Sequence, residues 1–562
     1  MIVNNDPTRT SNTPDGQRLQ AQLGSAADWK DIATRQTNPR RKRRRRILAI
    51  TITLLFLMLI LTTVRLSTVI SDTNDQLLVQ IGNQQTAVVD LRQSEPISPY
   101  LFGVNVFPEA GSNSVDADFT GFMDYTPSII EGLKNAQIKL LRFPGGNWSE
   151  RQNSREGGHI LSLDQLNDFS LLLNEVGAEG IIQARLSNPI DGTGIAAQLT
   201  TRANLAGRWV DYMNNPKSDL RTGKYAHAPF HPIKFWTVGN EPDRIINPSS
   251  PTNDIYTVSD YVNEFIEYSK VMHQNDPTIK VFGPEISQFY GLGAGPVDAQ
   301  GQLWMESFLK GVAKYEHAHP ELKFHLLDGV SFHRYPFLDA RTQPDLLLSS
   351  SAEWNYLLPP LRQLIRQDFN RDLPVAVTEI NTNPNGEVPT PGIASLWWAD
   401  TLATLMNQQV DYVGFFSAEG VNTPYPLFAK DGQHQTAMFR VMQLFSYLQH
   451  NLIPLGVQHD PVSLYATEDD AHQAVSLLFI NKSSNTQLVQ VSPANQVFGV
   501  GPWHSQDISL AAYSMVLVTL HHNADAEAYS FIVPAIDDPN LHPLNHVICG
   551  HKTDALANYI PC

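Results

Sequence analysis

The sequence predicts an α/β protein: a (β/α)8 TIM barrel, an additional antiparallel β-sandwich domain and an N-terminal single transmembrane helix. Three observations lead to this prediction. From residue 100, short β-prone runs alternate eight times with amphipathic stretches, and after residue 450 only short strands and turn residues follow. An uncharged apolar run of 18 residues, Ile47–Val64, directly follows a basic block. A chain of 562 residues is also long enough for at least two folded units.

The N-terminal segment is predicted to anchor the chain in a membrane. Residues 1–46 hold 11 Lys or Arg and 4 Asp or Glu among polar residues, which indicates a disordered basic tail. The apolar run reaches the roughly 17–25 residues that span a bilayer, and if Arg65 snorkels the anchor covers residues 47–70. The basic block predicts a cytoplasmic N-terminus and a single-pass cell-membrane protein whose folded domains are extracytoplasmic. A cleaved signal peptide is the alternative, but the leader is long and no A-x-A-like site follows.

The charge of the chain limits its possible binding partners, and its cysteine content limits its possible disulfide and metal sites. Beyond residue 46 the chain holds 29 basic and 52 acidic residues, which argues against nucleic acid as a partner. Binding of nucleic acid or acidic lipid by the basic block is an alternative, which the adjacent apolar run makes secondary. Cys549 and Cys562 either form one disulfide or remain free thiols. No Cys/His spacing suggests a metal, and no cofactor is expected.

Residues 98–450 are predicted to form the barrel. Amphipathic segments such as Leu163–Val176 and Ile393–Met406 lie between the strands and are expected to be helices. A doubly wound open sheet is the alternative, but no Gly-rich phosphate turn follows any strand. The eight expected strands are Leu101–Val106, Lys139–Phe143, Gly180–Arg185, Ile233–Val238, Lys280–Gly283, Gly329–Phe332, Val375–Thr378 and Tyr412–Phe416.

The β-sandwich is predicted to use both ends of the chain. Residues 455–522 contain short strands such as Ala474–Ile480 and Ser514–Leu520, separated by turn residues. Two further strands within residues 77–95 precede the barrel and are expected to join the same sandwich. Residues 523–562 are rich in His, Asn, Asp and Pro and are set apart as a C-terminal extension without an assigned structure.

Two carboxylates at strand ends carry the predicted chemistry. Residues at the C-terminal ends of the strands form the active site of such a barrel. The fourth strand runs into Gly239-Asn240-Glu241-Pro242 and the seventh into Thr378-Glu379. Retaining hydrolysis of a glycosidic bond needs a carboxylic acid and an ionised carboxylate about 5–5.5 Å apart. We therefore predict Glu241 as the acid/base and Glu379 as the nucleophile.

Six further residues are predicted to bind substrate or to support the pair. Asn240 is placed to hydrogen-bond a sugar hydroxyl, and Arg142 and Tyr335 are placed to hold Glu379 charged and aimed. Trp148 is expected at the rim, where an aromatic face can stack on a sugar. The six residues are Asn240, Arg142, His333, Tyr335, Trp148 and Glu285.

Each candidate also has a purely structural alternative. A single Glu at a strand end is more often a helix cap or a surface ion-pair partner, and it is the presence of both motifs that favours catalysis. Arg142 could be a structural ion-pair partner only. His333 could support the site without contacting substrate. Trp236, inside a strand, is expected in the barrel core.

Three motifs together resemble those of one large clan of enzymes. They are L-R-F-P-G-G at Leu141–Gly146, G-N-E-P at Gly239–Pro242 and T-E at Thr378-Glu379. The clan comprises retaining glycoside hydrolases with catalytic Glu residues on barrel strands 4 and 7. Over about residues 85–520 the chain is similar to families that build a β-sandwich from both chain ends: heparanase-like β-glucuronidases, α-L-arabinofuranosidases and β-xylosidase-like enzymes.

The resemblance implies an O-glycosyl hydrolase that acts on poly- or oligosaccharide, here expected outside the cytoplasm. The chain departs from each family. Arabinofuranosidases usually have Met where Pro242 stands, and heparanase-like enzymes usually lack the proline found here as Pro144. Neither family therefore predicts which sugar this chain would act on. Two other classes are considered: an inactive carbohydrate-binding membrane protein on this fold, and a membrane scaffold. The presence of both Glu residues favours the enzyme.

Overall fold

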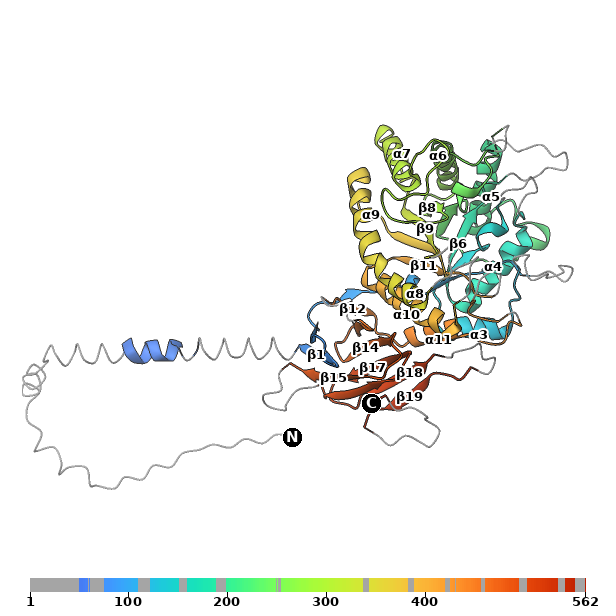
Figure 1. The fold of residues 1–562 in the computed structure, drawn as a ribbon. Coiled ribbons are helices and arrows are strands. Elements are labelled where there is room, and N and C mark those ends of the chain that lie inside the picture. The colour runs from blue at the N-terminus through green and yellow to red at the C-terminus, as the bar shows by residue number, and fades with distance from the viewer. Residues whose placement is uncertain are drawn as a thin grey trace, which may run out of the picture. The chain divides into compact units, whose positions relative to one another are not determined.

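The structure is a computed structural model. It describes residues 50–58, 60, 75–109, 122–150, 159–187, 199–248, 250, 254–336, 343–382, 389–419, 425–429, 431–455, 460–494, 503–533, 541–550 and 561–562. The chain divides into two compact units, Met1–Thr73 and Asn74–Cys562. The second unit contains the barrel and the β-sandwich (Figure 1).

Eight strands close into a barrel in the order β10-β11-β4-β5-β6-β7-β8-β9 (Figure 1). Every neighbouring pair around the barrel is parallel. The predicted barrel is therefore confirmed. The strands are β4 (Gly103–Asn105), β5 (Leu140–Phe143), β6 (Glu179–Ala184), β7 (Phe235–Val238), β8 (Lys280–Ile286), β9 (Gly329–Arg334), β10 (Val375–Ile380) and β11 (Tyr412–Phe415).

Helices follow the strands and cover the barrel. Several begin at a Ser or Thr whose side chain accepts a hydrogen bond from the first turn, such as Ser162 and Thr257, because the first amides of a helix have no partner within the helix. The helices are α3 (Pro127–Asn135), α4 (Leu163–Val176), α5 (Leu199–Asn214), α6 (Val258–Asn275), α7 (Trp304–Ala318), α8 (Pro344–Ser350), α9 (Trp354–Phe369), α10 (Pro391–Asn407) and α11 (Ala437–Phe445).

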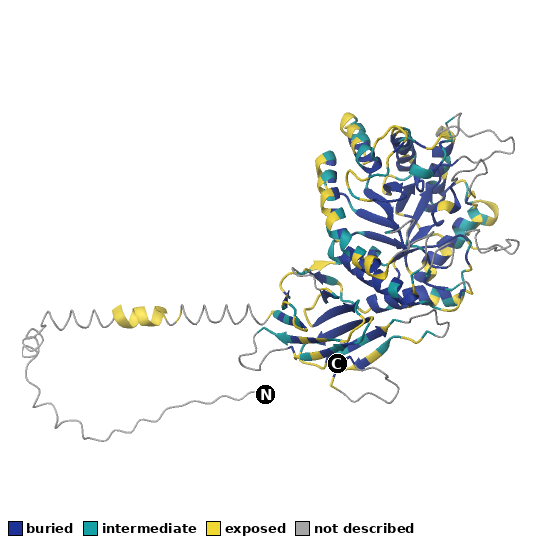
Figure 2. Ribbon diagram, in the orientation of Figure 1, coloured by how far each residue is buried: buried dark blue, intermediate teal, exposed yellow. Residues whose placement is uncertain are grey.

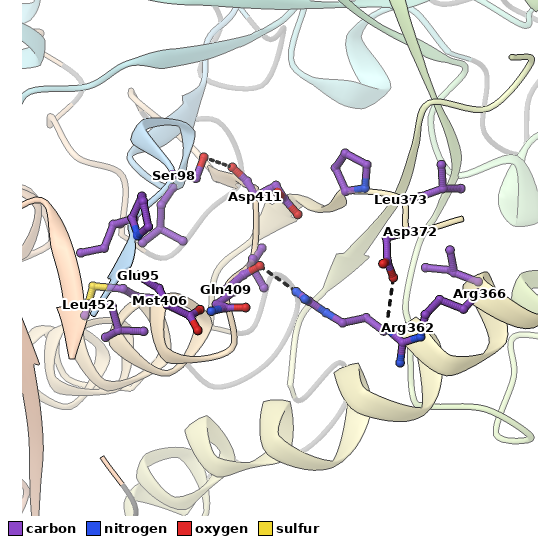
Figure 3. A pocket seen from close by; sticks show the side chains of 16 residues that line it. Glu95, Ser98, Arg362, Arg366, Asp372, Leu373, Met406, Gln409, Asp411 and Leu452 are labelled. Atoms are coloured by element: carbon purple, nitrogen blue, oxygen red, sulfur yellow. Dashed lines mark hydrogen bonds and ion pairs between the residues drawn. The ribbon is translucent and has the colours of Figure 1, made fainter. Parts of the chain in front are cut away.

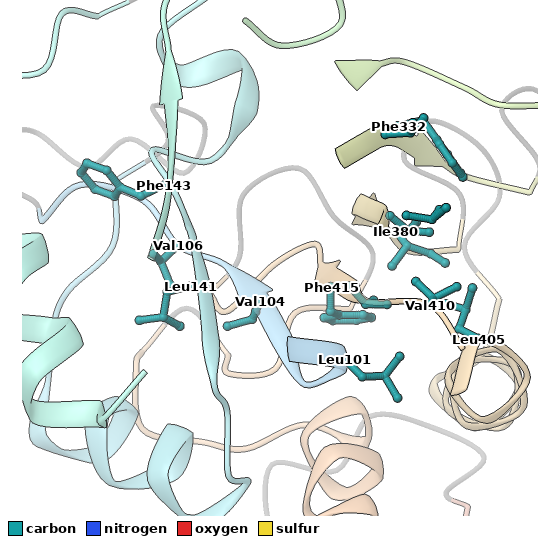
Figure 4. Packing of buried hydrophobic residues seen from close by; sticks show 14 of the residues in the cluster. Leu101, Val104, Val106, Leu141, Phe143, Phe332, Ile380, Leu405, Val410 and Phe415 are labelled. Atoms are coloured by element: carbon teal, nitrogen blue, oxygen red, sulfur yellow. The ribbon is translucent and has the colours of Figure 1, made fainter. Parts of the chain in front are cut away.

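The barrel strands are buried along their length (Figure 2). Figure 4 shows part of the main hydrophobic cluster, with Val104, Leu141 and Phe415 on neighbouring strands and Leu405 on α10. A second cluster fills the inside of the barrel at the N-terminal end of its strands, where Tyr412 stacks on Tyr100 with 5.3 Å between ring centroids. This cluster fills the interior at that end, and the active site of such a barrel lies at the opposite, C-terminal end of the strands.

Two antiparallel sheets form the second domain. One has the order β16-β15-β1-β2 and the other β19-β18-β17-β14-β13-β12-β3. Strands from before and after the barrel thus pair within each sheet. The strands are β1 (Gln76–Ile81), β2 (Ala87–Asp90), β3 (Glu95–Pro96), β12 (Asn451–Ile453), β13 (Val462–Glu468), β14 (Ala474–Asn481), β15 (Gln487–Pro493), β16 (Gln506–Leu510), β17 (Ser514–His521), β18 (Glu527–Ile532) and β19 (Asn545–Ile548).

The central strands of the larger sheet are buried on both faces. Alternate residues of β14 enter different cores: Leu477 and Phe479 pack inside the sandwich, whereas Leu478 and Ile480 belong to the cluster that also holds the barrel. Because successive side chains of a strand point to opposite faces, this sheet is a shared wall between the two domains. Residues 523–562 contribute β18 and β19 to it, and Cys549 and Cys562 form a disulfide.

The predicted transmembrane helix is not supported. None of the described helices combines the length and the apolar character that crossing a membrane requires. Within the predicted anchor the structure describes residues 50–58 and 60. Residues 1–46 and the rest of the predicted anchor lie outside the described residues.

Candidate active site

The two predicted catalytic carboxylates lie side by side at the C-terminal end of the barrel. Glu241 follows β7 by three residues, and Glu379 lies near the end of β10. One oxygen of each, together with a ring nitrogen of His333, lies within 4.8 Å of the other two. This spacing matches retaining enzymes, because inverting enzymes keep their carboxyl groups about 6.5–9.5 Å apart to admit a water molecule.

Arg142, at the third position of β5, is the centre of the hydrogen-bond network. Its Nη1 donates to Glu379 Oε1 at 2.9 Å and to Asn105 Oδ1 at 2.7 Å. Its Nη2 donates to Glu285 Oε2 at 2.7 Å and to Asn240 Oδ1 at 2.6 Å. The guanidinium is 1% exposed, and although burial alone would lower its pKa, the charges of Glu285 and Glu379 raise it. Arg142 is therefore a fixed cation that aligns side chains from four other strands or strand ends.

Glu285 is the fully buried counter-charge of this network. Burial alone would raise its pKa, but Arg142 and His333 lower the pKa of Glu285 to about 2. Thr378 Oγ1 donates to its second oxygen, Oε1, at 2.8 Å. Glu285 is thus ionised, and both of its oxygens are held by protein groups, which suits a supporting role under the site.

His333 and Tyr335, at the end of β9, orient the two carboxylates. His333 Nδ1 lies 3.1 Å from Glu241 Oε1 and 3.4 Å from Glu379 Oε2. Burial alone would lower the pKa of His333, but Glu379, Glu241 and Glu285 raise it to about 9. The Tyr335 hydroxyl donates to Glu379 Oε2 at 3.0 Å. Burial, together with Glu379 and Glu241, raises the pKa of Tyr335 well above its usual value, so its proton stays in place.

Irregularities in the backbone of β8 and β10 orient the side chains of Glu285 and Glu379. The register of β8 against β9 shifts between Pro284 and Ile286, and that of β10 against β9 shifts between Val377 and Glu379. Such β-bulges re-aim side chains next to active sites. Glu285 and Glu379 therefore point into the site because their strands are irregular at these positions.

The turn after β5 approaches Glu379 closely. A Cβ on Gly146, whose φ is +70°, would lie 2.3 Å from Glu379 Oε1 and 3.2 Å from Asn240 Oδ1. Only glycine fits this position, for reasons of both φ and space. Asn240 Nδ2 also donates to Asn147 Oδ1 at 2.9 Å, which ties the turn to the end of β7.

Trp148 lies deeper than predicted. Its ring stacks on His159 at 4.8 Å between centroids, meets Phe122 edge-on, and the residue is 6% exposed. Its role in stacking on a sugar stays a prediction. The structure thus brings seven of the eight predicted site residues into one network around Arg142 and His333, with Trp148 in a neighbouring aromatic group.

Sequence reasoning missed two residues of this site. Asn105, at the end of β4, accepts from Arg142 and donates to the backbone carbonyl of Thr378 at 2.9 Å. An amide ending a predicted barrel strand was a visible signal for it. Asp243 accepts a 2.8 Å hydrogen bond from the Ser287 backbone N–H. Nothing in the sequence connects these two positions.

A cavity of about 730 Å³ lies at the other end of the barrel (Figure 3). It is lined by residues that precede β10 and β11, including Asp372, Gln409 and Asp411, and by Arg362 of α9. It contains none of the predicted site residues. In barrels of this type the N-terminal end serves stability, so we assign the cavity no part in catalysis.

Comparison with known proteins gives partial matches in sequence. No family model matches the chain. It is 32% identical over 176 residues to intracellular exo-α-(1→5)-L-arabinofuranosidase 1 of Bacillus subtilis (strain 168), which covers 30% of this chain and 33% of that protein. The intracellular exo-α-(1→5)-L-arabinofuranosidase of Halalkalibacterium halodurans is 28% identical over 181 residues, again 30% of this chain and 33% of that protein. The match spans about a third of the length of these relatives.

Solved structures match over most of the chain. A structure titled arabinofuranosidase has a TM-score of 0.54 at 16% identity, covering 79% of this chain and 98% of that one. The GH51 α-L-arabinofuranosidase of Thermotoga petrophila RKU-1 has a TM-score of 0.53 at 17% identity, covering 81% and 95%. A GH family 44 xyloglucanase of Paenibacillus polymyxa, solved with xyloglucan, has a TM-score of 0.51 at 14% identity, covering 76% and 97%. These likenesses show the fold, and the predicted resemblance to glycoside hydrolases is confirmed.

The predicted location of the protein is corrected by these findings. A single-pass membrane protein with an extracytoplasmic catalytic domain was expected from the basic block and apolar run. Both matched relatives are named intracellular enzymes, and no described helix meets the requirements of a membrane span. The prediction rested on hydropathy and flanking charge alone, and these findings overturn it.

Proposed function

We propose that the protein is a retaining O-glycoside hydrolase with Glu379 as nucleophile and Glu241 as acid/base. The observation that carries this proposal is the close approach of the two carboxylates, within 4.8 Å, with Arg142 bound to Glu379 and His333 in contact with both. α-L-Arabinofuranosides are the substrates favoured by the names of the matched relatives. The three motifs support a retaining glycoside hydrolase without indicating the sugar.

The reaction proceeds by two displacements. In the first, a Glu379 carboxylate oxygen attacks the anomeric carbon, the glycosidic C–O bond breaks, and Glu241 gives its proton to the departing oxygen. In the second, Glu241 takes a proton from water, the water oxygen attacks the anomeric carbon, and the ester to Glu379 breaks. Configuration is retained because each displacement inverts it once.

The surrounding residues have distinct parts in this scheme. Arg142 and Tyr335 bind opposite oxygens of Glu379 and so fix its orientation for attack. Asn240 is held by Arg142 through its oxygen and by Asn147 through its nitrogen, next to where a sugar hydroxyl would lie. His333 contacts both catalytic carboxylates and holds them at a constant separation.

The test uses the full chain and its Glu379→Ala and Glu241→Ala variants on a panel of aryl glycosides: arabinofuranoside, xyloside, glucuronide, glucoside and galactoside. We expect turnover of the arabinofuranoside with retained configuration by NMR. Glu379→Ala should abolish turnover because it removes the nucleophile. Glu241→Ala should lose at least 10²-fold, a range typical of lost acid–base catalysis, and azide should restore part of this loss.

Glu264→Ala provides a matched control. Glu264 is also a buried carboxylate, paired with Arg202 at 2.6 Å, but it lies on α6 rather than at a strand end. This variant should lose stability and keep the kcat of its folded fraction, without any response to azide. Absence of turnover on every glycoside, or turnover unaffected by the two Glu changes, would refute the proposed function.

A further inference from the structure

The catalytic carboxylates and His333 also have the arrangement of metal ligands. His333 Nδ1 lies 3.1 Å from Glu241 Oε1 and 3.4 Å from Glu379 Oε2, and the three atoms lie within 4.8 Å of one another. Ligands bound tetrahedrally to Zn²⁺ at about 2.0–2.2 Å are roughly 3.4 Å apart. The three atoms therefore need only small movements to hold one ion, and binding displaces the proton that His333 Nδ1 shares with Glu241.

The second nitrogen of His333 strengthens this assignment. Nε2 lies 3.5 Å from Glu285 Oε2, and both side chains are fully buried. A metal-bound histidine typically presents its other ring nitrogen to a carboxylate, which fixes the ring and makes the bound nitrogen a better ligand. His333 thus already has the surroundings of a metal-binding histidine.

The positive charge already in the site, the Arg142 guanidinium, does not bind the carboxylate oxygen that a metal ion would need. Arg142 binds Glu379 through Oε1, whereas Oε2 is the oxygen that faces His333. Oε2 accepts one hydrogen bond from Tyr335, and a carboxylate oxygen has a second lone pair. A metal ion on the His333 side would therefore approach the face of Glu379 away from the guanidinium.

We infer that Glu241, His333 and Glu379 bind a Zn²⁺ ion that inhibits the enzyme reversibly. One imidazole and two carboxylates suit Zn²⁺ and its neighbours in the first transition row, whereas Mg²⁺ and Ca²⁺ prefer oxygen ligands in greater number. Bound Zn²⁺ occupies the acid/base and the nucleophile together, so it competes with substrate. The inhibition rests on the proposed function, but the binding does not.

A second His/Glu group on the β-sandwich supplies the matched control. Glu527 of β18 lies 3.1 Å from His521 Nε2 and 2.8 Å from His546 Nε2, and all three side chains are partly exposed. It offers the same ligand types at similar spacing, away from the strand ends of the barrel. Replacing His546 therefore tests whether any zinc bound by the chain is simply held by surface histidines.

The experiment is calorimetric titration of the full chain with Zn²⁺, for the wild type, His333→Gln and His546→Gln. We expect one tight site in the wild type that binds at least tenfold more weakly in His333→Gln and unchanged in His546→Gln. In the kinetic arm, Zn²⁺ should raise KM for the aryl arabinofuranoside at constant kcat, EDTA should reverse this, and Mg²⁺ should have no effect. Zinc affinity unchanged in His333→Gln, or lost only in His546→Gln, would overturn the inference.

The zinc site and the proposed glycosidase function can be refuted independently of each other. Zinc binding that depends on His333 in a chain with no glycosidase activity supports the metal site and refutes the proposed function. Glycosidase activity that Zn²⁺ does not affect, in a chain without a tight zinc site, refutes only the metal site. If His333→Gln does not fold, Glu379→Gln removes a different ligand and is titrated in its place, with the same expected loss.

Discussion

The backbone N–H of Glu241 donates a 2.8 Å hydrogen bond to the backbone carbonyl of Glu285. Both residues have left-handed backbone conformations, with φ of 48° and 58°. Such conformations are uncommon for residues other than glycine, and each costs roughly 1–2 kcal/mol. The turn that follows β7 and the end of β8 thus hold each other in shape, and the orientation of Glu241 depends on the neighbouring strand end as well as on its own turn.

Asp243 is expected to position Glu241. Its carboxylate accepts hydrogen bonds from both the backbone N–H and the hydroxyl of Ser287, which joins the same two turns. Asp243→Asn should slow cleavage of substrates with poor leaving groups by at least tenfold, because these need the proton from Glu241. A 2,4-dinitrophenyl glycoside needs no such proton and should be cleaved at nearly the wild-type rate. Equal losses for both substrates would show that Asp243 has no specific link to proton transfer.

Gly146 is expected to be essential for the placement of Glu379. Gly146→Ala puts a Cβ 2.3 Å from Glu379 Oε1, so the nucleophile must move. A shift of about 1 Å at a reacting group can lower the rate by 10²-fold, and we expect a loss in kcat of that order. Gly177→Ala is the control, since Gly177 has a similar φ of +74° but open space around it. Both variants should lose about 1–2 kcal/mol of stability, while only Gly146→Ala should lose activity.

His333 is expected to make the free energy of unfolding fall as the pH rises from 6.5 towards 9. Its pKa is about 9 in the folded protein, against 6.5 ordinarily, so the folded state binds the proton more tightly. The resulting stabilisation is complete below pH 6.5 and is lost as pH rises towards 9. It is worth about 3 kcal/mol as an order of magnitude. Urea unfolding of wild type and His333→Asn should therefore give free energies whose difference shrinks over this range; a constant difference would contradict the assignment.

The disulfide is expected to stabilise the end of the larger sheet. Cys549 and Cys562 are 13 residues apart, and closing a loop of this length contributes about 3 kcal/mol in the chain-entropy account. Cys549→Ser should lower the unfolding midpoint without changing kcat. Cys562→Ser and the double variant should match it, since each removes the same bond. Additive effects of the two single changes would mean that the thiols act independently.

Much of the site could be predicted because strand ends are visible in a sequence. Apolar runs that stop at Arg142, Glu241, His333 or Glu379 predict which side chains meet at the C-terminal end of a barrel. The contribution of Glu285 was harder to judge, because its direction depends on a shift of register between Pro284 and Ile286. Such a shift results from how neighbouring strands pack and leaves no pattern along the chain.

Contacts between distant positions were not predictable. Asp243 and Ser287 are 44 residues apart, and no local pattern links them. The pairing of Cys549 with Cys562 was one of two possibilities until the fold brought them together. Trp148 was expected at the rim, where it could stack on a sugar, but Phe122 and His159 pack around it. The membrane prediction rested on hydropathy and flanking charge alone, and neither the described helices nor the names of the matched relatives support it.

The pairing of β1 with β15 has a consequence for biosynthesis. β1 ends at Ile81 and β15 begins at Gln487, so the ribosome must add about 400 residues before one edge of β1 can find its partner. At about 5–20 residues per second, that edge is open for roughly 20–80 s while the barrel emerges and folds. During translation that edge of β1, whose other edge pairs with β2, thus exposes backbone N–H and C=O groups that favour pairing with the strands of other chains.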